Sequence, residues 1–460
     1  MREIATLGCL AGILLLLRLD RERAARVSGA LWLPVAWTFL AGSRSVSEWV
    51  GSDYQPETPD VLLDGSPLDR FVITTLLVVG IGVLLSRWPR VAGVLRANGP
   101  VVIFVLWAGA SVLWSDYPDV AFKRWIKACG NVVMVLIVLT EADPAAALRR
   151  YLARLAFMLI PLSVLFIKYY PDLGRQYHRW TWTVSYTGVT MSKNSLGYVC
   201  LVFGIASLWR VLEARRPSPR SSAVSFRTRR RARLAHGLIV VMTLWLLLVA
   251  NSATSLACFV VAGLLMMAVG RPSFARSPHM IVGLGLVVAL CGLLFADLFT
   301  AVLGRDPTLT GRTDLWDQLV AMTPNPVLGA GYESFWLGDR LERLWQQYWW
   351  HPNQAHNGYL EIFLNLGAIG VGLLASVIFR GYRNVVVALN ADPSTGRLRL
   401  AYLVAAVLYN FTEAAFKGMH LVWIIFFLAV VRGPRPAPAP VVEAPLEDLA
   451  LERFPAEPVA

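Results

Sequence analysis

Residues 351–372 read HPNQAHNGYLEIFLNLGAIGVG, and this stretch changes character near its middle. Its first half carries polar and titratable side chains, among them His351, His356 and Asn357, and an apolar run follows at once. A membrane helix needs about 20 mostly apolar residues to cross the hydrocarbon. The pattern therefore predicts a loop that enters a membrane helix, with a histidine held at the membrane surface.

The composition of the whole chain agrees with a membrane protein. Of 460 residues, 56% are hydrophobic and 16% charged, and the mean hydropathy is +0.54, which is far more apolar than a soluble domain. The predicted fold class is all-α, a polytopic transmembrane bundle of about 12–13 helices. The apolar segments lie at 3–18, 28–43, 70–86, 100–114, 124–140, 151–168, 194–212, 235–251, 254–270, 279–300, 357–379, 399–415 and 418–432.

Charge predicts the orientation of the bundle. The net charge is +13, and in a membrane protein Lys and Arg concentrate in cytoplasmic loops, so we expect no nucleic-acid partner. The segment 213–233, whose Ser and Pro content favours a flexible linker, holds many arginines against one acid, Glu213, and is predicted to be cytoplasmic. Counting helices outward from it places four loops outside. These are 44–69, 115–123, 169–193 and 301–356.

Four regions follow from this layout. Residues 1–300 are a predicted transmembrane helical region, 301–356 a partly helical periplasmic loop, and 357–432 the C-terminal transmembrane helices. The acidic, Pro/Ala-rich tail 433–460 is predicted to be disordered and cytoplasmic. The five cysteines lie in apolar stretches without pairing or metal spacing, so we assign them no chemistry.

The long outer loop opens with a helix signal. Thr310 can cap a helix whose first turns carry Asp314 and Asp317, and this helix should end before Pro324. Arg312 then lies in the first turn, beside free backbone N–H groups, where it would favour an anion.

Five tryptophans in this loop fit two interpretations. Trp345, Trp349 and Trp350 fit an interfacial belt, with rings at the level of the lipid head groups. Trp316 and Trp336, which flank the Arg and Gly motifs, are the better candidates for a platform on which sugar rings stack.

The two loop histidines differ in their neighbours. His351 and His356 lack the spacing of a zinc pair, so we expect no metal and no cofactor. Asn357, Gly358 and Glu361 follow His356 at the mouth of a helix, where a neutral imidazole can take a proton. Walker, GxGxxG, HExxH and CxxC motifs are absent from the sequence.

Three motifs in order carry a family resemblance. GRTDLW at 311–316, LGAGY at 328–332 and AHNGYLE at 355–361, followed by LGxxG, resemble the O-antigen ligase and polysaccharide polymerase superfamily, and within it most of all the exopolysaccharide-production polymerases. Two fainter matches are MSKNSLG at 191–197, where a helix begins, and NFTE at 410–413 in a late helix.

The resemblance implies a bacterial inner-membrane glycosyltransferase that works on the periplasmic face. It would transfer a glycan from undecaprenyl pyrophosphate to an acceptor hydroxyl, with inversion and without a metal. His356 would be the base. Arg312 and Lys193 would stabilise the leaving pyrophosphate, because positive charge is needed where negative charge develops.

The same resemblance implies a wider set of substrate-binding residues. This set comprises Lys193, Arg175, Arg179, Trp316, Tyr332, Trp336, Asn357 and Glu413. For Lys193, snorkelling at the start of a helix is an equal interpretation, and for Arg175 and Arg179 pairing with lipid head groups or with Asp172 is the better one. Glu413, expected inside an apolar helix, would orient either His356 or Lys417.

Three functions remain open from the sequence. A polymerase of repeat units and a ligase that attaches glycan to a lipid or protein acceptor use the same donor chemistry. The third is a transporter or flippase of lipid-linked sugars, but polar residues gather at the outer surface here rather than at the midplane, which favours an enzyme. The expected partners are the undecaprenyl-pyrophosphate-linked glycan, an acceptor glycan or lipid, the bilayer and other polysaccharide-assembly proteins.

Overall fold

The computed structural model describes residues 1–20, 26–51, 66–177, 183–215, 223–269, 279, 283 and 310–434. Four predictions lie outside these residues: nearly all of the segment 279–300, the loop arginine Arg179, the cysteine Cys291 and the tail from residue 435. Arg312 belongs to a described helix, but its side chain lies outside the described part.

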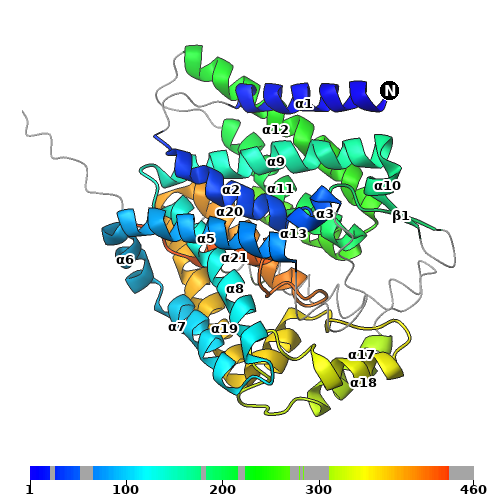
Figure 1. Cartoon of the computed structure of the whole chain (residues 1–460). Helices are drawn as coiled ribbons and strands as arrows, with labels where there is room; N and C mark the ends of the chain where they lie inside the picture. The colour runs from blue at the N-terminus through cyan, green and yellow to red at the C-terminus, as the bar shows by residue number, and fades with distance from the viewer. Residues whose placement is uncertain are drawn as a thin grey trace, which may run out of the picture.

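The described residues form a bundle of helices with one small hairpin (Figure 1). The helices are α1 (Arg2–Leu19), α2 (Trp32–Ala41), α3 (Val46–Val50), α5 (Pro67–Ser86), α6 (Trp88–Ala97), α7 (Gly99–Ala110), α8 (Pro118–Leu139), α9 (Pro144–Tyr169), α10 (Pro171–Gly174), α11 (Lys193–Ala214), α12 (Ala223–Ala250), α13 (Ala253–Ala268), α17 (Thr310–Ala321), α18 (Gly338–Gln347), α19 (Gly358–Ala391), α20 (Pro393–Tyr409) and α21 (Leu421–Val430). Short 3-10 helices cover Gly29–Leu31 and Ser111–Trp114. The antiparallel hairpin pairs β1 (Arg175–Tyr177) with β2 (Val184–Tyr186), and Gln176 lies opposite Ser185.

Length and hydropathy confirm a polytopic helical membrane protein. Among the described residues, five helices, α5, α9, α11, α12 and α19, are long and apolar enough to cross a membrane, and the bent pair formed by α6 and the segment Gly99–Trp114 would make six. Each predicted segment within the described residues coincides with a helix, but α2, α13 and α21 are shorter than a full span. This count is lower than 12–13 because three segments form short helices, because α1 and α8 carry several charged residues, and because 279–300 lies almost entirely outside the described residues.

Two predicted boundaries are wrong. Helix α12 begins at Ala223, so the arginines from Arg227 to Arg233 lie on a helix and not in a flexible linker. Helix α20 ends at Tyr409, so Glu413 lies in the loop before α21 and not inside a helix. Here the Asn410 side chain bonds Ala406 O (2.8 Å) and Ala415 N (2.9 Å), which closes a turn within an apolar stretch. Hydropathy continues across this turn and therefore does not reveal it.

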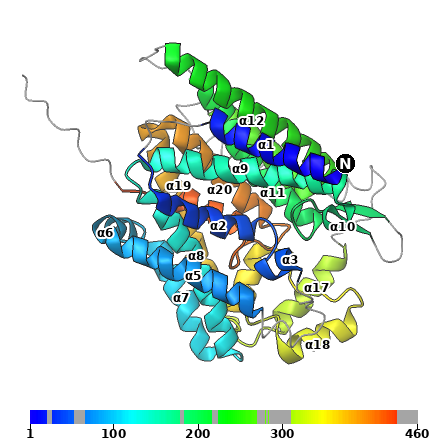
Figure 2. The ribbon, with the colours of Figure 1, turned by 45° about the horizontal axis from the view of Figure 1, so that its top comes forward.

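Helices α9 and α11 form the centre of the bundle, and most of their residues are buried. Helices α1 and α12 lie side by side over α9 at one edge (Figure 2). Helix α5, at another edge, leaves most of its apolar side chains exposed. Exposed apolar faces of this kind are expected where lipid surrounds the helices.

Contacts between helix ends separate two faces of the bundle. At one face Arg87 Nη2 lies 2.8 Å from Glu141 Oε1, and the same carboxylate accepts from Ser28. At the other face the Arg44 guanidinium donates to the carbonyl of Leu173. The first contact joins ends that are predicted to be on the inner side, and the second joins predicted outer loops.

Helix α19 is broken at Gly367, and this break positions the outer loop. Gly367 has φ 65° and ψ −168°, which only glycine readily adopts. The loop 326–331 packs on the break: Ala330 N donates to Leu364 O (2.9 Å), and Ala368 N donates to Pro326 O (2.8 Å). A Cβ on Gly367 would lie 2.1 Å from Val327 O. The loop 326–331 and the residues on both sides of the break therefore supply each other's backbone hydrogen bonds, as a helix broken within a membrane requires.

Candidate functional site

The outer loop has a hydrophobic core of its own. Helix α17 runs from Thr310 to Ala321 and ends before Pro324, as predicted. Leu315 and Leu319, one turn apart on α17, are fully buried together with Leu341 and Leu344 of α18. This core also includes Ala355, so it supports the residue that precedes His356.

The AHNG motif begins α19 through specific backbone contacts. Asn357 Oδ1 accepts from the N–H groups of Tyr359 (3.0 Å) and Leu360 (3.1 Å), which makes Asn357 the N-cap of the helix. Gly358 N donates to Asn410 O (2.8 Å), and a Cβ on Gly358 would lie 2.0 Å from Asn410 Oδ1. His356 adopts a left-handed backbone with φ 50°. The motif thus docks directly on NFTE and holds the His356 backbone in an uncommon conformation.

Glu413 connects His356 to the start of α11. His356 Nδ1 lies 3.2 Å from Glu413 Oε2, and Asn194 Nδ2 donates to Glu413 Oε1 at 3.1 Å. Ser192 caps α11 by accepting from Ser195 N, so MSKNSLG does start a helix, as predicted. Of the two partners considered for Glu413, the structure brings it to His356, and AHNG, NFTE and MSKNSLG meet at this carboxylate.

This geometry determines which imidazole nitrogen is available. An ionised carboxylate can only accept a hydrogen bond, so Nδ1 of His356 carries the proton when it bonds to Glu413. Nε2 then keeps its lone pair and can accept a proton from another group. The imidazole is half-buried, and Glu413 stabilises the imidazolium that such a transfer would form.

A pocket of about 190 Å³ lies beside this cluster. Lys417 Nζ donates to Gln354 Oε1 at 3.1 Å, and Gln354 Nε2 lies 3.4 Å from His356 Nδ1. The pocket residues come from the outer loop and from α8, α19 and the α20–α21 loop. They are Arg124, Tyr332, Glu333, Trp336, Asn353, Gln354, Glu361, Ile362, Asn365, Leu366, Ala414, Phe416 and Lys417. The pocket therefore combines cationic, acidic and aromatic side chains next to the imidazole.

Glu361 is a half-buried acid in the wall of the pocket. Trp336 Nε1 donates to both of its oxygens at 3.1 and 3.0 Å, and Ala355 N donates to Oε1 at 2.6 Å. These bonds satisfy the carboxylate and fix the Trp336 ring. Trp316 is fixed similarly, because its Nε1 donates to Ala355 O at 2.8 Å. Both rings are thus packed within the loop, whereas Trp349 is 84% exposed.

Tyr332 of the LGAGY motif is buried in the pocket wall. Its backbone N–H donates to Ser111 Oγ at 2.9 Å, which ties the motif to the end of α7. Burial, followed by the nearby charge of Glu333, raises the pKa of the Tyr332 hydroxyl well above its usual value. This hydroxyl therefore remains a proton donor at neutral pH.

The cationic candidates differ in their distance from the His356 cluster and in whether other contacts already occupy them. Lys193 is exposed on the first residue of α11, next to Asn194 and thus near the His356 cluster. Arg175 instead donates twice to Ile167 O, at 2.9 and 2.7 Å, and its guanidinium lies over the Tyr186 ring. These contacts hold Arg175 between α9 and the hairpin. Arg312 lies on α17 with its side chain outside the described part.

Sequence reasoning did not select Arg124 and Glu333. The Arg124 guanidinium donates to Glu333 O, and Gly418 N donates to Glu333 Oε1 at 2.6 Å. Glu333 has φ 50°, so a second polar residue of this site is held in a left-handed conformation. An available signal was the ionisable Arg124 near the outer end of a predicted membrane segment, where such residues tend to line cavities.

Comparisons with known proteins confirm the family resemblance. Residues 238–375 match the model of the O-antigen ligase family, and this range contains the GRTDLW, LGAGY and AHNGYLE motifs. The chain is also 26% identical over 334 residues to the exopolysaccharide production protein ExoQ of Rhizobium meliloti (strain 1021), which covers 67% of this chain and 70% of that protein. Asn194 and Glu413 lie outside the family match, yet the fold brings them to His356.

Proposed function

We propose that this multi-pass membrane protein is a glycosyltransferase of polysaccharide assembly that uses a lipid-pyrophosphate-linked glycan as its donor. The observation that carries the proposal is the His356–Glu413–Asn194 cluster beside a polar pocket. The match to the O-antigen ligase family and the similarity to an exopolysaccharide production protein support this class of substrate.

In the proposed reaction His356 Nε2 takes the proton of an acceptor sugar hydroxyl. The acceptor oxygen attacks the anomeric carbon, and the bond from that carbon to the pyrophosphate oxygen breaks with inversion. The electron pair leaves on the carrier pyrophosphate, which we take to be undecaprenyl pyrophosphate. Glu413 stabilises the resulting imidazolium, and a general base of this kind contributes about 10²–10⁴-fold to the rate.

Positive charge near the leaving group completes the proposal. Lys193 at the start of α11, Lys417 and Arg124 in the pocket, and Arg312 on α17 are the candidates to stabilise the pyrophosphate. Cations placed where negative charge develops lower the barrier without reorganisation during the reaction. We assign the site to the periplasmic face of a bacterial inner membrane, because the arginine-rich stretches lie at the other ends of the helices.

Polymerisation of repeat units is the reaction we favour, with O-antigen ligation as the alternative that the matched family's description supports. The transporter alternative is weaker. The backbone groups released at the Gly367 break are bonded by the loop 326–331, so this break is a docking site for the outer loop.

The test is deletion of the gene, followed by complementation and sizing of the cell polysaccharide. His356→Asn removes the base while Asn tolerates a left-handed backbone. The matched control is His351→Asn, because His351 also has a left-handed φ (48°) but stacks on Trp345 outside the cluster. We expect no polymer from His356→Asn and normal polymer from His351→Asn, at equal membrane levels.

The intermediate that accumulates identifies the reaction. Single repeat units on the carrier lipid indicate a polymerase, and long unattached chains indicate a ligase. Full-length, attached polymer from cells with His356→Asn would refute the assignment of the base, and an unchanged profile in the deletion strain would refute the proposed function.

A further inference from the structure

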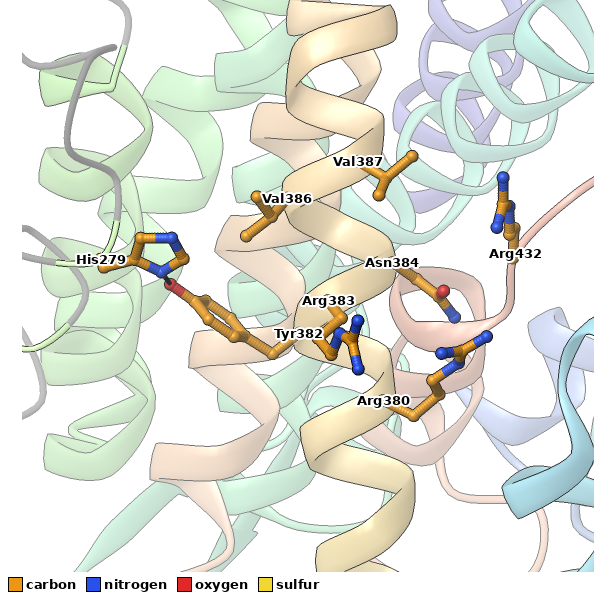
Figure 3. Close-up of a pocket in the computed structure, with 8 residues that line it drawn as sticks. All are labelled: His279, Arg380, Tyr382, Arg383, Asn384, Val386, Val387 and Arg432. Carbon is orange, nitrogen blue, oxygen red and sulfur yellow. Dashed lines mark hydrogen bonds between the residues drawn. The ribbon is translucent and has the colours of Figure 1, made fainter.

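A second charged pocket, of about 320 Å³, lies at the ends of α19 and α21 that are remote from His356. Figure 3 shows Arg380, Arg383 and Asn384 on α19, with Arg432 on one side and His279 on the other. Beyond the break at Gly367, α19 rises by about 20 Å to Arg380, and the basic stretch from Arg380 to Arg397 is of the kind that marks the side opposite the outer loop. This pocket is therefore at the opposite membrane surface.

Helix geometry gathers its arginines on one side of α19. Arg380, Arg383 and Val387 are spaced i, i+3 and i+7, so they form one stripe, and Tyr382 and Val386 form the neighbouring stripe. The Tyr382 hydroxyl lies 2.5 Å from His279 Nδ1, which closes one side of the pocket. The arrangement presents several hydrogen-bond donors in one hollow.

The other side of the pocket is held by an amide network. Asn384 Nδ2 donates to Val430 O at 2.9 Å, and Arg432 N donates to Asn98 Oδ1 at 2.8 Å. Arg399 donates to the carbonyls of Ala429 and Val431, so another guanidinium lies close to Arg432. The end of α21 is thus fixed to α19 and brings further positive charge to the pocket.

These arginines have no acidic partner among the residues that the structure describes. No salt bridge in that part of the chain involves Arg380, Arg383 or Arg432, although the side chains of Arg380 and Arg432 are partly buried. At the same membrane face Arg87 is paired with Glu141. Several guanidinium groups in one pocket repel one another unless an anion lies between them.

We infer that this pocket binds the phosphate of an anionic phospholipid head group. Guanidinium groups match phosphate oxygens with paired hydrogen bonds, and basic pockets between transmembrane helices recognise anionic head groups. A lipid fits better than free phosphate because apolar surface continues from the pocket along α19. Phe379, on the bilayer side of Arg380, is 65% exposed, which provides a contact for acyl chains.

The experiment is a lipid titration of the purified full-length protein by native mass spectrometry. The probes are phosphatidylglycerol, phosphatidylcholine and inorganic phosphate. We expect the wild-type protein to bind phosphatidylglycerol more tightly than phosphatidylcholine. Combined Arg380→Gln, Arg383→Gln and Arg432→Gln should weaken phosphatidylglycerol binding on the order of 100-fold, or about fivefold for each arginine.

Two further variants keep this test decisive. Arg18→Gln is the matched control, because Arg18 is an exposed arginine at the end of α1, on another part of the bundle, and should bind lipid as the wild type does. Arg383→Gln alone, at an exposed position, should lose about fivefold if the triple variant fails to fold.

Several results would overturn the inference. One is wild-type affinity for phosphatidylglycerol in the triple variant. If the triple variant does not fold, wild-type affinity in Arg383→Gln has the same meaning. Another is a loss of affinity in Arg18→Gln equal to that in the arginine variants of the pocket. Displacement of the lipid by millimolar inorganic phosphate would indicate a site for free phosphate. If phosphatidylglycerol is preferred only after removal of residues 436–460, the acidic tail is the occupant and the lipid is not.

Discussion

Two charged clusters, one at each end of the bundle, use their residues in opposite ways. At the end that carries the outer loop, His356 and Asn194 both bond to Glu413, and Lys417 bonds to Gln354. At the other end Arg380, Arg383 and Arg432 share a pocket without an acid among the described residues. A histidine bonded to a carboxylate can accept and pass on a proton. Arginines that share a pocket without an acid are stabilised when an anion binds between them. This difference separates a site for chemistry from a site for binding.

The largest effect is expected from the break that positions the outer end. Gly367→Ala should destabilise the protein by at least about 3 kcal/mol, because the added Cβ would meet Val327 O and the backbone conformation favours glycine. Gly372→Ala is the control, since a Cβ there meets nothing within 4 Å. Thermal unfolding in detergent measures both. A Gly367→Ala protein as stable as wild type would show that the outer end does not depend on this break.

Glu413→Gln should lower transfer on the order of 100-fold, because a neutral amide stabilises the His356 imidazolium less than a carboxylate does. The pH dependence of the remaining transfer should also change. Glu342→Gln on the exposed face of α18 is the control. If the His356 cluster and the arginine pocket act independently, the Glu413→Gln variant binds phosphatidylglycerol as tightly as the wild type. If the Glu413→Gln variant transferred glycan at the wild-type rate, the assignment of Glu413 to the site would be wrong.

The Arg87–Glu141 pair, at the predicted inner face, gives a pH-dependent test. Burial raises the pKa of Glu141, but hydrogen bonds from Ser28 and the Arg87 charge outweigh it and lower the pKa below 4.5. Because the folded-state pKa is the lower one, the stabilisation is present above about pH 4.5 and disappears as the pH falls through the folded-state value. Glu141→Gln should therefore destabilise by about 1–2 kcal/mol at pH 7 and much less in acid. A loss independent of pH would contradict the ionic origin.

Asn194→Ala should have the smallest effect, roughly a five- to tenfold loss of transfer, because it removes one hydrogen bond to a charged group. Asn390→Ala, at the exposed end of α19, is the control. Equal activity of the two variants would show that Glu413 is oriented without Asn194.

Much of the outer site was predictable from local sequence. The capping pattern around Thr310 predicted α17, and the change from polar to apolar residues after Asn357 predicted the start of α19. The glycines of LGAGY and LGxxG also carry a local signal, because Gly329, Gly331 and Gly367 have positive φ, which glycine adopts readily. Such signals are readable because capping and backbone freedom depend on a few adjacent residues.

Other features depended on contacts between distant residues. Asn194 and Glu413 are 219 residues apart, and Arg124 is 209 residues from Glu333. The loop that contains Glu413 was predicted as a helix, because its apolar residues continue the hydropathy of α20. Trp336 was a candidate for sugar stacking, but its ring bonds to Glu361 in the pocket wall.

By itself the sequence determined the membrane class, the positions of most helices and the residue types at the outer surface, because hydropathy, capping and charge are local properties. Only the tertiary structure decided that Glu413 meets His356 and that three arginines from α19 and the end of α21 share a pocket. The physical reason is that such pairs arise from helix packing, which a linear pattern does not encode.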